Sequence, residues 1–196
     1  MVYYVLVYAK MEYSQMDSNL RKEKYRIGIL HGKIHPQRTS SEAQIQLTVY
    51  LTQRINICRK RNESTFVRIL GYELPLKKDC KRGKCIDLVG YDKDHNLYII
   101  ELKKKSSSER ISKIRNQIIE YGEYINQIRP YLEKEFYSEY HFPIKFKAIK
   151  KIILAPLEFY NHKDLIPGDI EYAYFADKNI ERRKPGGIIN IHLVRM

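Results

Sequence analysis

The sequence predicts an α/β protein with a mixed central β-sheet flanked by helices. Extended and helical patterns alternate along the chain in the order strand, helix, strands, long helix, strands. The segment 106–140 repeats an apolar residue every three or four positions, which is the periodicity of a helix with one buried face. The segment 146–157 is rich in Ile and Leu, which indicates a strand in the centre of a sheet.

The length and composition fit one compact unit. The chain has 196 residues, enough to bury a substantial core. Hydrophobic residues make up 43% of it and charged residues 30%, which excludes a disordered chain. Three cysteines without a CxxC pair and six scattered histidines do not form a zinc pattern. We expect residues 1–38 to form an N-terminal strand and extension, and residues 39–196 to form the main domain.

The first half of the chain predicts strands around one helix. Residues 2–8 are apolar but lack the basic start and cleavage site of a signal peptide, so we expect a strand, and residues 25–34 can hold one or two more. We expect a helix over 39–60, because Ser40 or Ser41 can cap it and apolar residues follow at helical spacing. Residues 65–76 have an extended pattern, and Pro75 marks the end or edge of that strand.

The second half predicts a hairpin, a long helix and three strands. Residues 85–103 form the hairpin, with residues 92–96 at its tip. The acids of this tip also suggest a calcium loop, but the Gly and the distal Glu of an EF-hand are absent. Pro130 is expected to break or kink the helix over 106–140. Segments 170–176 and 187–196 add strands after the central one. The predicted apolar stripe of the helix consists of Ile111, Ile114, Ile118, Tyr121, Ile125 and Ile128.

Two acids interrupt the apolar strands of the hairpin. Asp87 and Glu101 each stand between aliphatic residues, and a buried charge there is costly unless something compensates it. A turn centred on Asp94 places them opposite each other, with Cβ atoms about 5 Å apart. Two carboxylates at that separation need a cation or a shared proton, and Mg²⁺ accepts such a pair together with water and substrate phosphate. Lys103 points to the same side as Glu101, whereas a register slip of one residue would separate the acids.

Asp87 followed by the triplet Glu101-Leu102-Lys103 resembles the motif of the PD-(D/E)XK nuclease superfamily, although Ile86 stands where the family name has Pro. The resemblance covers about residues 40–155. It implies a restriction-endonuclease-like core, in which the acid and the E-x-K triplet lie on adjacent strands. By this resemblance, residues 39–196 form a nuclease-like domain that hydrolyses phosphodiester bonds with the help of a metal.

Two helices add to the resemblance. Gln117 and Tyr121 lie four apart on one side of the long helix and are similar to the QxxxY motif of the RecB-like branch. Glu42 lies in the first turn of the preceding helix, where many members keep a metal-linked Glu. The resemblance thus implies a catalytic set of Asp87, Glu101, Lys103, Gln117 and Tyr121. Its implied ligands for Mg²⁺, or for Mn²⁺ in its place, are Asp87, Glu101 and Glu42.

Each of these residues also has a structural interpretation. Asp87 and Glu101 can lie at strand ends, with Lys103 as their ion-pair partner. Glu42 can serve only as an acid favoured by the helix dipole. Of the two helical residues, the Gln can be a surface residue beside the apolar stripe, and the Tyr can belong to the core.

The net charge of +13 favours a polyanionic partner. Two basic clusters bracket the hairpin, where phosphates would have to be held. We expect nucleic acid as the partner, with DNA favoured over RNA. We also expect a cytoplasmic protein without membrane association, for which a homodimer is possible. The alternatives are a catalytically inactive nucleic-acid-binding module of the same fold and a basic scaffold for a protein. The expected nucleic-acid contacts are Lys77, Lys78, Lys81, Arg82 and Lys84, and Lys104, Lys105, Arg110, Lys113 and Arg115.

Overall fold

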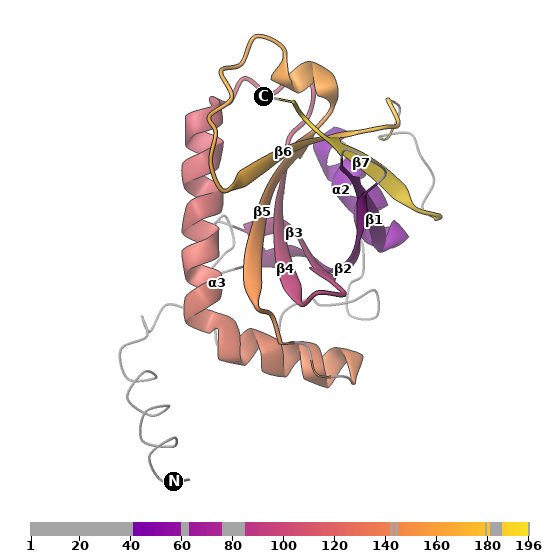
Figure 1. The fold of residues 1–196 in the computed structure, drawn as a ribbon, viewed down its shortest axis with the longest axis vertical. Helices are drawn as coiled ribbons and strands as arrows, with labels where there is room; N and C mark the ends of the chain where they lie inside the picture. Colours follow the sequence, from indigo (N-terminus) through magenta and orange to yellow (C-terminus); the bar gives the residue numbers. More distant parts are fainter. Residues whose placement is uncertain are drawn as a thin grey trace, which may run out of the picture.

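Seven strands close into a barrel in the computed structural model of this chain (Figure 1). The structure describes residues 41–59, 63–75, 85–141, 143, 145–178, 180 and 186–195. The elements in this part of the chain are α2 (Ser41–Thr52), β1 (Arg54–Cys58), β2 (Ser64–Pro75), β3 (Cys85–Asp92), β4 (Asn96–Leu102), α3 (Ile111–Tyr140), β5 (Ala148–Ala155), the 3-10 helix η3 (Leu157–Tyr160), β6 (Ile170–Phe175) and β7 (Ile189–Leu193). No helix among these is long and apolar enough to cross a membrane.

The barrel mixes antiparallel and parallel pairs. Strands β1 to β4 pair antiparallel in sequence order, β4, β5 and β6 pair parallel, and β7 pairs antiparallel with β6. Strand β7 also pairs parallel with β1, from Ile55 opposite Ile189 to Cys58 opposite His192. This last pairing closes the barrel, and it leaves neither β1 nor β7 as a free edge strand.

The predicted fold class is therefore wrong. An open central sheet flanked by helices, with a restriction-endonuclease-like core, would leave two edges unpaired, whereas here the outer strands pair with each other. The reason lies in β1, which the helical pattern over 39–60 concealed. The helix ends at Thr52, Gln53 has a positive φ of 58°, and Ile55 and Ile57 then alternate with polar residues as the buried face of a strand.

Two apolar clusters lie on the two sides of the barrel wall. The interior cluster takes inward-pointing side chains from all seven strands and is completed by Ile45, Val49 and Tyr50 of α2. The outer cluster lies between α3 and the outward face of β2 to β6. Figure 1 shows α3 running beside β5 and changing direction sharply toward its C-terminal end. Pro130 lies inside this helix, so the helix is bent rather than broken.

Several local predictions are confirmed. The hairpin forms with its predicted tip, and all six residues of the predicted apolar stripe on α3 are buried. The segments 146–157, 170–176 and 187–196 contain β5, β6 and β7, and the segment 65–76 matches β2 to within one residue at each end. The Asp92 carboxylate accepts hydrogen bonds from Asp94, Asn96 and Tyr98, which ties up its oxygens in the hairpin turn. The predicted strands within residues 1–38 lie outside the described residues.

Candidate functional site

The hairpin has the register that places the two acids together. Leu88 lies opposite Ile100 and Val89 opposite Ile99, as a turn centred on Asp94 requires. The backbone pairing of the two strands ends at Leu88. Beyond it, the side chain of Asp87 makes the contact between the strands. Its Oδ2 accepts a hydrogen bond of 2.7 Å from the backbone N–H of Leu102, beside Glu101.

Glu101 presents one engaged and one unpaired oxygen in a buried position. The residue is 2% exposed. Its Oε1 accepts hydrogen bonds from Lys103 Nζ at 2.8 Å and from Gln117 Nε2 at 3.0 Å. Its Oε2 is buried without a hydrogen-bond partner. Burial raises the pKa of this carboxyl, and the charge of Lys103 acts in the opposite direction. An unpaired, buried carboxylate oxygen calls for a cation or a proton.

Asp87 has the electrostatics expected of a crowded acid. Burial and then the negative charge of Glu101 raise the pKa of the Asp87 carboxyl well above its ordinary value, while the hydrogen bond from Leu102 acts against the rise. The backbone at this point is fixed from the other side as well. Gln46 of α2 donates from Nε2 to the Asp87 carbonyl oxygen at 2.8 Å. The carboxylates therefore repel each other at a position that two helices and a hairpin hold in place.

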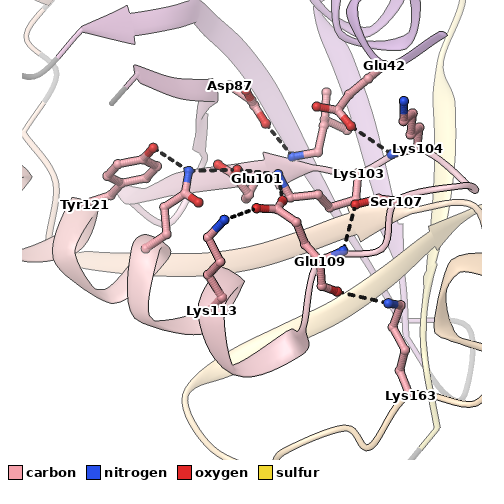
Figure 2. A network of polar contacts seen from close by, with 12 residues as sticks. Glu42, Asp87, Glu101, Lys103, Lys104, Ser107, Glu109, Lys113, Tyr121 and Lys163 are labelled. Carbon is pink, nitrogen blue, oxygen red and sulfur yellow. Dashed lines mark hydrogen bonds and ion pairs between the residues drawn. The ribbon is translucent and has the colours of Figure 1, made fainter. Parts of the chain in front are cut away.

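Lys103 lies between two carboxylates (Figure 2). Its side chain is 8% exposed, and its Nζ is 2.8 Å from Glu101 Oε1 and 3.1 Å from Glu109 Oε2. Burial alone would lower the pKa of the Lys103 amine, but the charge of Glu101 and its hydrogen bond raise it above its ordinary value. The amine is therefore held as a buried cation next to the acid pair.

Glu109 links this cation to the surface. Its Oε1 is 2.8 Å from Lys113 Nζ, and its carbonyl oxygen accepts a hydrogen bond of 3.0 Å from Lys163 Nζ. The sequence analysis did not single out Glu109 or Lys163. Glu109 lies just before the first turn of α3, and an acid at a helix start close to a basic residue of the first turn is the signal that could have found it. Gln46 was also missed, because its contact with Asp87 joins α2 to β3 and no local pattern in the sequence relates these two segments.

The long helix contributes the predicted pair. Gln117 donates from Nε2 to both Glu101 Oε1 and the Tyr121 hydroxyl, the latter at 2.6 Å. Burial raises the pKa of Tyr121 above its ordinary value, so its hydroxyl stays protonated. Tyr121 also belongs to the outer cluster. Both interpretations of this residue therefore hold, since one side chain packs in the core and fixes the amide that contacts Glu101.

Glu42 lies close to the acid pair but is engaged elsewhere. Its Oε2 accepts a hydrogen bond of 3.0 Å from the backbone N–H of Lys104, and its charge raises the pKa of both Asp87 and Glu101. Within the described residues, no group of three or more His, Cys, Asp and Glu side chains is arranged to hold a metal ion. That Glu42 is a third metal ligand therefore stays a prediction.

The predicted basic contacts divide into four groups. Lys105 and Lys113 are exposed and pair with Glu158 and Glu109, and Arg110 is exposed at the start of α3. Lys104 is half-buried. Arg115 instead supports a loop, because it donates to the Ile166 carbonyl at 2.8 Å and to the Tyr172 hydroxyl at 3.0 Å. The cluster before the hairpin lies outside the described residues: Lys77, Lys78, Lys81, Arg82 and Lys84.

Comparisons with protein-family models, with curated proteins and with solved structures yielded no match to this chain. Inferences about its activity therefore rest on the geometry and chemistry of the residues described above.

Proposed function

We propose that this protein is a metal-dependent nuclease that hydrolyses phosphodiester bonds, with DNA as the favoured substrate. The observation that supports this most directly is the buried, unpaired Oε2 of Glu101 beside the Asp87 carboxylate. Burying a carboxylate oxygen without a partner is costly, so this atom is suited to bind a cation. The motif of Asp87, Glu101 and Lys103, with Gln117 and Tyr121, supports the same chemistry.

The donor set fits Mg²⁺. Carboxylate oxygens are its preferred protein ligands, and it is commonly held by one or two carboxylates, with waters and substrate phosphate as the others. Asp87 and Glu101 would hold it, so a cluster of three acids is not required. When bound, such an ion polarises a phosphate and lowers the pKa of a coordinated water. Mn²⁺ prefers similar ligands.

The surrounding residues prepare the acid pair for this task. Gln117 and Lys103 both bind Oε1 of Glu101, which leaves Oε2 as its available oxygen. The protonated Lys103 amine supplies a fixed positive charge where negative charge develops on the phosphate during attack. Glu109 holds that amine from its other side and limits its motion. Tyr121 orients Gln117 through its hydroxyl.

A second function is a nucleic-acid-binding module without catalysis. One observation favours it: Lys103 is already neutralised by Glu101 and Glu109 without a metal ion. A network that compensates its own charges is also what a structural ion-pair cluster would show. The two functions differ in whether bound nucleic acid is cleaved when Mg²⁺ is added.

Digestion of circular and linear DNA with Mg²⁺, Mn²⁺ or EDTA tests the proposal. We expect cleavage with the metals and none with EDTA, and loss of cleavage in Lys103→Ala. The matched control is Lys150→Ala, which removes an exposed lysine of β5 outside the site. A filter-binding assay run in parallel separates the two functions. Binding by the wild type without cleavage under any metal condition would favour the inactive module.

A further inference from the structure

The outward face of β1, β2 and β7 differs from the rest of the barrel wall. Strand side chains alternate between the two faces of a sheet. On these strands the inward residues, among them Ile57, Val67 and Ile191, belong to the interior cluster. The residues between them point outward, on a side that α3 does not cover. These outward residues are Arg54, Asn56 and Cys58 of β1, Ser64, Phe66 and Arg68 of β2, and Asn190 and His192 of β7.

The strand register joins these residues into one continuous surface. Asn56 lies opposite Phe66 on one side and opposite Asn190 on the other, and its Nδ2 donates to Asn190 Oδ1 at 3.0 Å. His192 lies opposite Tyr174 of β6, and their rings stack with centroids 5.5 Å apart and planes 29° apart. The surface therefore carries the exposed ring of Phe66 at one side and a half-buried stacked pair at the other, of which Tyr174 also packs against the outer cluster.

The exposure and charge of this surface are those of a binding face. Phe66, the third residue of β2, is 55% exposed although it is a large apolar ring. Arg54 lies directly opposite Arg68, and both are exposed. Two exposed positive charges side by side favour an anionic partner. None of the eight outward residues is acidic.

We propose that the outward face of β1, β2 and β7 binds single-stranded nucleic acid. Bases would stack on Phe66 and on the ring pair of His192 and Tyr174, while Arg54 and Arg68 hold phosphates. Proteins that bind single strands on a sheet use this combination of exposed rings and positive charge. A duplex keeps its base faces stacked inside and cannot offer them to these rings. The two arginines, two asparagines and one histidine make the face too polar for the core of an interface with a second copy.

This surface goes beyond the proposed nuclease site. Strand β2 pairs directly with β3, but Phe66 and Arg68 lie at the end of that pair where Val67 is opposite Asp92. Asp87 lies toward the other end, where Leu74 is opposite Ile86. Binding here therefore does not require the acid pair or a metal ion. It would let the protein hold a single strand while the hairpin site meets another part of the nucleic acid.

Fluorescence anisotropy with a labelled oligothymidine tests the proposal in EDTA, where metal-dependent cutting cannot occur. We expect the wild type to bind the single strand more tightly than a duplex of equal length. Phe66→Ala should weaken binding about tenfold, because one stacked base is lost. Arg54→Ala should reduce the slope of log affinity against log salt by about 0.7. Both residues are exposed, so neither change should alter the melting temperature appreciably.

The matched control is Tyr137→Ala, which removes a ring that is 57% exposed on α3. It should bind oligothymidine like the wild type. The proposal is overturned if Phe66→Ala and Tyr137→Ala bind equally well, or if the wild type does not bind at all. A dimer that Phe66→Ala dissociates in sedimentation would also overturn it. Absence of cleavage in Mg²⁺ would count against the nuclease alone, because this assay does not depend on catalysis.

Discussion

Replacing Asp87 by Asn should stabilise the protein without metal and abolish its response to Mg²⁺. Burial and the charge of Glu101 raise the pKa of the Asp87 carboxyl well above its ordinary value, so its ionised form weakens the folded state. Asn keeps an oxygen that can accept the hydrogen bond from the Leu102 N–H. The change therefore removes the repulsion and keeps the local backbone contact.

The size of the effect follows from the geometry. Directly opposed residues on paired strands have Cβ atoms about 5 Å apart, and two like charges at that separation repel by about 3 kcal/mol at an effective dielectric constant of about 20. The attraction of Lys103 for Asp87 offsets part of this. A net gain of about 1 kcal/mol corresponds to a rise in melting temperature of about 2–4 °C for a chain of this size.

Thermal melts in EDTA and in excess Mg²⁺ measure this effect. Wild type should gain about 2.7 kcal/mol at a Mg²⁺ concentration of about 100 times Kd, whereas Asp87→Asn should gain much less. Asp92→Asn is the matched control on the same strand. Its carboxylate is satisfied by hydrogen bonds in the hairpin turn, so this change should lower the melting temperature in both conditions.

The pH dependence gives an independent check. A carboxyl whose pKa is higher in the folded state binds more protons there, so stability falls as pH rises between the two pKa values. For Asp87 this window opens at the ordinary value of 3.8 and extends to the raised folded pKa. Metal-free wild type should therefore melt higher at about pH 5 than at about pH 8, and Asp87→Asn should show a smaller difference. Clear destabilisation of Asp87→Asn in EDTA would refute the reasoning, because it would show that Asp87 has a stabilising ionic partner.

Other changes have equally defined outcomes. Lys103→Ala should reduce cleavage at least about a hundredfold while affinity in the filter-binding assay changes little. It should also destabilise the metal-free protein by about 3 kcal/mol, because two carboxylates lose their buried partner. Burial alone would raise the pKa of Asp92, but hydrogen bonds, those from Asn96 foremost, lower it. The stability that Asp92 contributes should be present above its ordinary pKa of 3.8, and it should disappear in acid melts as the pH falls through the lowered folded pKa. Tyr121→Phe should cost about 1 kcal/mol in denaturant unfolding, since Gln117 loses one acceptor. Affinity for DNA should fall steeply with salt in a filter-binding titration, and a flat response would show that the charge of +13 has another purpose.

The sequence by itself determined the parts of the protein that depend on local periodicity. The stripe on α3 follows from a repeat of three to four residues, and the hairpin register follows from alternation around a short turn. Because strand parity fixes which side chains share a face, the proximity of Glu101 and Lys103 could be predicted as well. The spacing of Gln117 and Tyr121 predicted their shared side of the helix in the same way.

Only the tertiary structure decided the features that join distant segments. The pairing of Ile55 with Ile189 closes the barrel, and nothing in either segment alone specifies its partner. The same holds for the contact of Gln46 with Asp87 and for the support of Lys103 by Glu109, which depend on how α2, the hairpin and the start of α3 pack together. Long-range pairing is chosen by the burial of apolar faces in the assembled core, and a local pattern records only that a face is apolar.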